Sequence, residues 1–167
     1  MRVIFLDVDG VLNHKCFDDE YMSNYNYNNK NEIVGVDPEK VKILAKICEE
    51  TYSKVVLSSS WKLGLEHGYV SKSLYRLVEM LYDNGIDLID VTPCIPNPSK
   101  GGGQEMWKEW DIECYLHEHP EVTKYCIFDD ETYDLLTKKD HLIQTDWKKG
   151  ILPEHVNEVR RIYRKGR

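Results

Sequence analysis

Short apolar runs recur along the chain, and longer segments with helical spacing separate them. Each run is bounded by polar or turn-forming residues, which is the pattern of a buried strand. The segments between the runs begin with residues that favour helix N-termini and carry apolar side chains on one face. Strands are therefore predicted at residues 2–6, 54–57, 86–91, 123–128 and 142–144.

Four helices are predicted between and after these strands. The first two follow N-cap candidates, and in the first a proline also favours the opening turn. The second helix should end at Gly85 and bury an apolar face of Leu74, Leu77, Val78 and Leu81. In order, the helices follow Asp37-Pro38, follow Ser71, span residues 110–117 and follow Pro153.

Strands that alternate with helices predict an α/β fold. Right-handed crossovers would give a Rossmann-like three-layer sandwich, with a mainly parallel sheet and helices on both faces. At 167 residues the chain fits a single domain, residues 1–167, in which residues 14–36 form a short flap or minimal cap insert. In such sheets the ligand site lies beyond the carboxyl ends of the strands.

Composition narrows the function classes. The chain has 41% hydrophobic residues, 31% charged residues and a net charge of −7, which is typical of a globular protein and argues against a broad nucleic-acid-binding surface. No apolar run approaches the roughly 20 residues of a membrane span. Because Met1 leads directly into the first strand, we expect no signal peptide and a cytoplasmic protein. Cys48, Cys114 and Cys126 lie in apolar patterns and are predicted to be buried, reduced thiols.

Acidic and hydroxyl residues directly follow three of the predicted strands. Two aspartates separated by one residue on a strand point to the same side, and their carboxylates repel each other unless a cation lies between them. Taken singly, each group also fits a turn or a helix cap, but together at one edge of a sheet they form a hard-oxygen site that suits Mg²⁺. The residues are Asp7, Asp9 and Gly10, then Ser58, Ser59 and Lys62, then Asp129 and Asp130.

These segments resemble the haloacid dehalogenase (HAD)-type phosphohydrolases. The run Phe5-Leu6-Asp7-Val8-Asp9-Gly10-Val11-Leu12 is similar to the first motif of that superfamily, Val55 to Ser58 is similar to the second, and Cys126 to Asp130 is similar to the DD form of the fourth. DVDGVLN, LSSSWK and FDDE are further similar to the small capless HAD domains found alone or in RNA-repair proteins. The resemblance spans nearly the whole chain.

The resemblance implies a magnesium-dependent phosphoric monoester hydrolase with an aspartyl-phosphate intermediate. Asp7 would be the nucleophile and Asp9 the general acid and base, which are roles that carboxylates perform in phosphoryl transfer. The Ser58 hydroxyl would bind phosphoryl oxygens, with Gly10, Ser59 and Lys62 around the substrate. Mg²⁺ would be held by Asp7, the backbone carbonyl of Asp9, and Asp130, with Asp129 either supporting these ligands from behind or serving as an alternative ligand, and Asp134 as outer support.

The family also requires a basic third-motif residue before the fourth strand. Lys108 opens Lys-Glu-Trp-Asp-Ile-Glu-Cys-Tyr-Leu, which resembles a pattern of the closer relatives, whereas Lys100 precedes Gly101-Gly102-Gly103, a glycine run that would let a loop close over a phosphate. Lys108 is favoured because it lies where the helix begins, and Lys100 is retained as a substrate-binding candidate.

Several substrates and one non-catalytic function stay open at this stage. A nearly capless site favours a large phosphorylated substrate, such as a nucleic-acid end, and nucleotides and phosphoproteins also fit. Tyr21, Tyr25 and Tyr27, interleaved with asparagines, would either stack on bases or pack as a polar flap. The alternative is a catalytically silent module that binds phosphate or a protein partner. The sequence names no protein partner and predicts no membrane contact.

Overall fold

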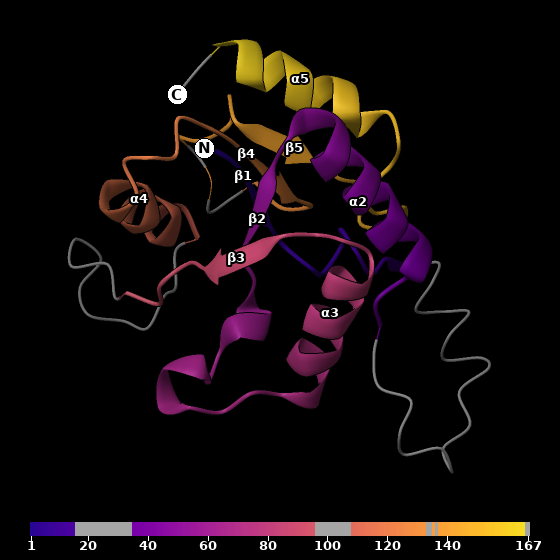
Figure 1. Cartoon of the computed structure of the whole chain (residues 1–167), viewed down its shortest axis with the longest axis vertical. Helices are drawn as coiled ribbons and strands as arrows, with labels where there is room; N and C mark the ends of the chain where they lie inside the picture. The colour runs from indigo at the N-terminus through magenta and orange to yellow at the C-terminus, as the bar shows by residue number, and fades with distance from the viewer. Residues whose placement is uncertain (16–34, 96–107, 133–134, 136, 166–167) are drawn as a thin grey trace.

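The protein is described by a computed structural model that covers residues 1–15, 35–95, 108–132, 135 and 137–165. Its centre is a five-stranded sheet in which every neighbouring pair is parallel (Figure 1). The strand order is β3-β2-β1-β4-β5. The strands are β1 (Arg2–Leu6), β2 (Lys54–Leu57), β3 (Leu88–Val91), β4 (Lys124–Asp129) and β5 (Leu142–Gln144).

Helices cover both faces of the sheet, so the predicted α/β, Rossmann-like architecture is confirmed. Figure 1 shows α4 alone on one side and the other three helices on the opposite side. Two 3₁₀ turns, η1 (Ser60–Lys62) and η2 (Leu65–His67), follow β2. The helices are α2 (Pro38–Thr51), α3 (Lys72–Asp83), α4 (Lys108–Glu118) and α5 (His155–Lys165).

The alternation of side chains along β1 divides the core in two. Ile4 and Leu6 lie in the larger cluster, with α2, α3 and α5, whereas Val3 and Phe5 lie in the smaller one, with α4. All four are fully buried because neighbouring strands flank β1 on both sides and helices cover both of its faces. Phe5 meets Tyr115 of α4 edge to face, with ring centroids 5.5 Å apart.

The two predicted N-caps are confirmed. The side chain of Asp37 accepts a hydrogen bond from the backbone N–H of Glu39 at 2.9 Å, and that of Ser71 accepts one from Leu74 at 3.0 Å. Each cap satisfies a backbone donor that the first turn of a helix leaves unpaired. These local signals are sufficient to start α2 and α3 where the sequence predicts.

Four details differ from the sequence prediction. Val78 is 41% exposed instead of packing with the other apolar residues of α3, and Cys114 is partly exposed on α4. The strand predicted from residue 86 begins at Leu88, because the pairing of β2 with β3 is irregular where β3 starts. The α4 helix begins at Lys108, two residues before the predicted start.

The predicted insert and the absence of membrane spans can be compared with the structure only in part. Most of the predicted insert, residues 16–34, lies outside the described residues, so the division into one domain with a short insert stays a prediction. Within the described part of the chain, no helix is both long enough and apolar enough to cross a membrane.

Candidate active site

The register of the three central strands aligns their carboxyl ends. Leu6 of β1 pairs with Leu57 of β2 on one side and with Phe128 of β4 on the other. The next residues along these strands, Asp7, Ser58 and Asp129, therefore form one row across the edge of the sheet. Backbone hydrogen bonds continue the ladder there, from Asp7 N–H to the Phe128 carbonyl at 3.0 Å and from Ser58 N–H to the Leu6 carbonyl at 2.8 Å.

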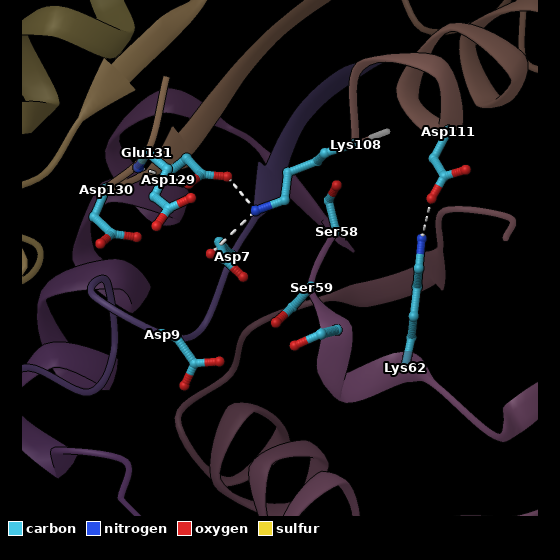
Figure 2. Close-up of a pocket in the computed structure, with 11 residues that line it drawn as sticks. Asp7, Asp9, Ser58, Ser59, Lys62, Lys108, Asp111, Asp129, Asp130 and Glu131 are labelled. Atoms are coloured by element: carbon cyan, nitrogen blue, oxygen red, sulfur yellow. Dashed lines mark hydrogen bonds and ion pairs between the residues drawn. The ribbon is translucent and has the colours of Figure 1, made fainter. Parts of the chain in front are cut away.

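A cavity of about 340 Å³ opens over this row. Figure 2 shows side chains from the ends of β1, β2 and β4 and from α4 directed into it. Eight of the eleven lining residues are charged, and six of those eight are acidic. The lining residues are Asp7, Asp9, Ser58, Ser59, Ser60, Lys62, Lys108, Asp111, Asp129, Asp130 and Glu131.

Lys108 lies among a cluster of carboxylates. Its ammonium nitrogen is 3.1 Å from Asp7 Oδ2 and forms a close ion pair with Asp129, which has no solvent exposure (Figure 2). Asp130 adds a third carboxylate, so the cluster of Asp7, Asp129 and Asp130 exceeds the single positive charge of Lys108. An excess of negative charge in a buried position favours the binding of a cation or the uptake of a proton.

The acid–base properties of the cluster follow from this crowding. Burial acts to lower the pKa of Lys108, but the Asp7 and Asp129 carboxylates outweigh it and raise that pKa above its usual value. Burial raises the pKa of Asp129 to about 7; Lys108 opposes this rise and the Asp7 carboxylate adds to it. The pKa of Asp130 is raised as well, mainly by burial. Lys108 therefore stays protonated, and its single positive charge does not balance the three carboxylates.

The geometry of the cluster fits a divalent cation. Asp7, Asp129 and Asp130 each present one carboxylate oxygen, and these three oxygens lie within 4.8 Å of one another. Carboxylate oxygens are hard ligands of the kind that Mg²⁺ and Ca²⁺ prefer. The Asp9 side chain does not belong to this group, so of the four predicted metal residues three meet through their side chains.

Asp9 is held apart from the cluster by two donors. Asn13 Nδ2 donates to Asp9 Oδ1 at 2.7 Å, and Trp61 Nε1 donates to Asp9 Oδ2 at 3.0 Å. The indole of Trp61 packs against the larger hydrophobic cluster, which anchors its N–H. Both oxygens of Asp9 therefore have a fixed hydrogen-bond donor, while the residue itself stays exposed at the cavity.

Gly10 makes the close approach of two loops feasible. Its φ of +68° lies in the left-handed region, and a Cβ at this position would lie 2.3 Å from Cγ of Asp130. Its backbone N–H donates to Asn13 Oδ1 at 2.9 Å. The predicted contact of Gly10 with substrate stays a prediction, and the structure adds a packing reason for glycine.

Ser58 carries an unused hydroxyl. Its side chain is 1% exposed, and its Oγ has no hydrogen-bond partner among the described residues. A buried polar atom without a partner costs free energy, so it is rare unless it serves a ligand. The hydroxyl of the neighbouring Ser59, by contrast, accepts a 3.4 Å hydrogen bond from the backbone N–H of Trp61.

Lys62 lines the same cavity but is fully engaged. Its ammonium donates to Asp111 Oδ2 at 2.7 Å, to Thr92 Oγ1 at 2.6 Å and to the carbonyl of Pro93 at 2.9 Å. An ammonium has three hydrogens, and each has an acceptor here. A role of Lys62 in substrate binding stays a prediction, and a substrate would have to displace one of these acceptors.

Two predicted site residues have no described position, and several residues at the cavity were not predicted. Lys100 and Asp134 lie outside the described residues, so only Lys108 of the two competing lysines has a described position. Asn13, Asp111 and Glu131 were not singled out, and Trp61 was left undecided. Asp111 had a usable signal, since it follows Lys108 by three residues and so shares its helix face.

Comparison with known proteins agrees with this geometry. Residues 3–156 match the model of the "HAD domain in Swiss Army Knife RNA repair proteins". The chain belongs to this family. The match covers both the acidic strand ends and the lysine-bearing α4 of this HAD domain, so the family suggested by its motifs is confirmed.

Among solved structures, the HAD domain is similar to D,D-heptose 1.7-bisphosphate phosphatase from B. bronchiseptica, whose crystal structure is complexed with magnesium and phosphate. The two chains share 18% sequence identity with a TM-score of 0.46, over 81% of this chain and 73% of the other. None of the curated proteins matches the HAD domain.

Proposed function

We propose that this HAD domain is a magnesium-dependent phosphatase that hydrolyses phosphomonoesters through an aspartyl-phosphate on Asp7. The observation that carries the proposal is the row of Asp7, Ser58 and Asp129 with the Lys108 ammonium among the carboxylates. It combines a nucleophile, a free hydroxyl donor and a positive charge in one cavity. Phosphoryl transfer depends mainly on such positioning and charge stabilisation.

In the first half-reaction, a carboxylate oxygen of Asp7 attacks the substrate phosphorus, and the bond from phosphorus to the leaving oxygen breaks. Protonated Asp9 gives its proton to that oxygen, which leaves as an alcohol. The Ser58 hydroxyl and the Lys108 ammonium donate to phosphoryl oxygens and stabilise the charge that they carry. Lys108 also orients Asp7, because its ammonium lies 3.1 Å from Oδ2 of that residue.

In the second half-reaction, the Asp9 carboxylate takes a proton from a water molecule, and the water oxygen attacks the phosphorus. The bond between phosphorus and the Asp7 oxygen breaks, so inorganic phosphate leaves and Asp7 is again a carboxylate. Asp9 ends protonated and ready for the next substrate. Asn13 and Trp61 hold the Asp9 carboxyl group in position for both proton transfers, because each donates a hydrogen bond to one of its oxygens.

The proposed metal ligands are Asp7, the backbone carbonyl of Asp9, and Asp130, with Asp129 as a further or alternative ligand. When bound, Mg²⁺ supplies positive charge that screens the carboxylates from one another and from the substrate phosphate. The three side-chain oxygens within 4.8 Å support this assignment. Lys108 reduces the repulsion in the cluster before any metal binds.

The proposed substrates are nucleic-acid ends or nucleotides, supported by the RNA-repair family to which the domain belongs. A cytoplasmic location is part of the same proposal. The alternative, a catalytically silent module that binds phosphate, predicts binding without turnover.

The test is phosphate release from 4-nitrophenyl phosphate with Mg²⁺ or with a chelator, for wild type and Asp7→Asn. Release that requires Mg²⁺ and disappears in Asp7→Asn supports the proposal. Thermal unfolding with and without Mg²⁺ provides a readout independent of turnover, and we expect Mg²⁺ to raise the Tm. Wild type that binds Mg²⁺ and phosphate but releases none from any phosphomonoester would support the silent module instead.

A further inference from the structure

An exposed turn beside the loop of Asp9 carries a tryptophan and two lysines. Residues 145–151 follow β5 at the same edge of the sheet as the cavity. Thr145 Oγ1 donates to the Gly10 carbonyl at 2.8 Å, and the backbone N–H of Ile151 donates to the Val11 carbonyl at 2.9 Å. The turn is thus attached to the loop that directly follows Asp9.

The turn and the adjoining Lys15 form a patch of one aromatic and three basic side chains. Trp147 is 48% exposed, and the Lys15 and Lys148 ammonium groups lie 5.2 Å and 5.6 Å from its ring centroid. Lys149 is the next residue and is also exposed. The backbone N–H of Lys15 donates to the Trp147 carbonyl at 3.0 Å, which joins the two segments. We call these four residues the rim patch.

The rim patch is positive in an acidic protein. Within the described ranges, none of its three lysines forms an ion pair with a carboxylate, although the whole chain carries a net charge of −7. Two acidic side chains that adjoin the patch have hydrogen-bond partners of their own: Asp146 accepts from the backbone N–H of Lys148, and Asp37 binds His14. Unpaired lysines around a tryptophan suit a ligand that has both an aromatic face and negative charge.

The geometry points to single-stranded nucleic acid: we propose that the rim patch binds a strand whose terminal phosphate enters the cavity over Asp7. This inference rests on the proposed phosphatase function and names its substrate. The reacting phosphate must lie by Ser58 and Lys108, so the rim lysines require other phosphates, and a nucleoside monophosphate has none. A base would stack on Trp147.

The lysines over the tryptophan do not prevent this binding. A base that stacks on Trp147 replaces an exposed cation–π contact, and stacking of a base on an aromatic ring is the stronger interaction. A displaced lysine then reaches an internucleotide phosphate, because its side chain is long and exposed. Aromatic stacking with lysine contacts to the backbone is how proteins bind single strands without reading sequence.

The test compares uridine octamers carrying a 3′- or a 5′-phosphate with 4-nitrophenyl phosphate as substrates. We expect Trp147→Ala to lower kcat/KM for the better octamer by about tenfold, the loss of one stacked base, and to leave the small substrate unchanged. Tyr82→Ala, which removes an exposed tyrosine of α3, is the matched control and should change neither.

Lys148→Gln/Lys149→Gln should reduce the salt dependence of octamer binding by about 1.4 in log–log slope. Lys42→Gln/Lys46→Gln on α2 should leave it unchanged.

The outcomes separate the two proposals. Equal losses on both substrates in Trp147→Ala, or an octamer no better than uridine monophosphate or a phosphopeptide, would overturn the rim patch while the phosphatase stands. A wild type that hydrolyses nothing would overturn the phosphatase. In that case the binding of a fluorescein-labelled octamer to the same variants still decides on the patch, and binding unchanged by Trp147→Ala would refute it.

Discussion

Two lysines, the buried Lys62 and the partly buried Lys108, line the same cavity, and their surroundings differ in charge balance. Lys62 faces one carboxylate, Asp111, and two neutral oxygens, so its charge and its hydrogens are all matched. Lys108 contacts Asp7 and Asp129, with Asp130 in the same cluster, so negative charge remains in excess (Figure 2). Both lysines have an ammonium group in contact with a carboxylate.

The difference in charge balance distinguishes a structural ion pair at Lys62 from a candidate ligand site at Lys108. The Lys62–Asp111 pair, with side chains 4% and 3% exposed, joins η1 to α4 and needs nothing further. The Lys108 cluster, by contrast, has more negative than positive charge, and the Ser58 hydroxyl beside it has no hydrogen-bond partner in the described part of the chain. Buried groups that lack a partner indicate a place where a ligand completes the structure.

The largest expected effect is on the nucleophile. Asp7→Asn should lower kcat for phosphate release by about 10⁴-fold or more, since covalent catalysis loses its attacking group. Its free energy of unfolding should change by less than about 1 kcal/mol, because lost attraction to Lys108 and relieved repulsion from Asp129 offset each other. Steady-state kinetics and urea unfolding measure both, and a variant that retains wild-type turnover would remove Asp7 as the nucleophile.

Exchanging each lysine for methionine tests the comparison directly. Lys62→Met should lower the free energy of unfolding by about 3–5 kcal/mol, because Asp111 is left buried and unpaired, and Mg²⁺ should not restore it. Lys108→Met should lower kcat by roughly 10²–10³-fold, and its loss of stability should be recovered in Mg²⁺. The control Lys62→Met/Asp111→Leu should regain most of the stability. Equal behaviour of the two single variants in Mg²⁺ would break the comparison.

Gly10→Ala should disturb the acidic cluster by displacing Asp130. The added Cβ would lie 2.3 Å from Asp130 Cγ, so Asp130 must move, and we expect a roughly 100-fold loss of kcat/KM and weaker Mg²⁺ binding. Gly85→Ala is the matched control: its φ is also positive, at +71°, but no atom lies within 4 Å of the added Cβ. It should cost about 1–2 kcal/mol of stability and leave activity unchanged. Comparable activity losses in both variants would attribute the effect to backbone strain alone.

The smallest effect concerns Asp9. Trp61→Phe retains a packed ring but removes the N–H that donates to Asp9 Oδ2, so we expect kcat to fall by about tenfold. The loss should be larger for an alkyl phosphate than for 4-nitrophenyl phosphate, since a poor leaving group depends more on protonation. Trp147→Phe, which alters an indole without contact to Asp9, serves as the control. A uniform loss for both substrates would indicate a packing defect instead.

The strand ends are where sequence prediction succeeded. Strands β1, β2 and β5 begin and end at the predicted residues, because each contains buried apolar residues that the sequence pattern locates. The residues predicted to follow three of the strands, Asp7, Ser58 and Asp129, lie in one row at the edge of the sheet. Prediction failed for Val78, whose helical spacing suggested burial, because a periodic pattern does not show how far the neighbouring elements extend over a helix.

By itself, the sequence determined the parallel α/β fold, the N-caps and the identity of the acidic strand ends, since these depend on residues close together in the chain. Only the tertiary structure decided the partners of the side chains. Lys62 and Asp111 are separated by 49 residues, and Asp9 and Trp61 by 52, so no local pattern relates them. The same holds for Lys108, whose function follows from the carboxylates that β1 and β4 bring to it. Charge balance in a buried site is a property of the folded neighbourhood, and folding alone brings those charges together.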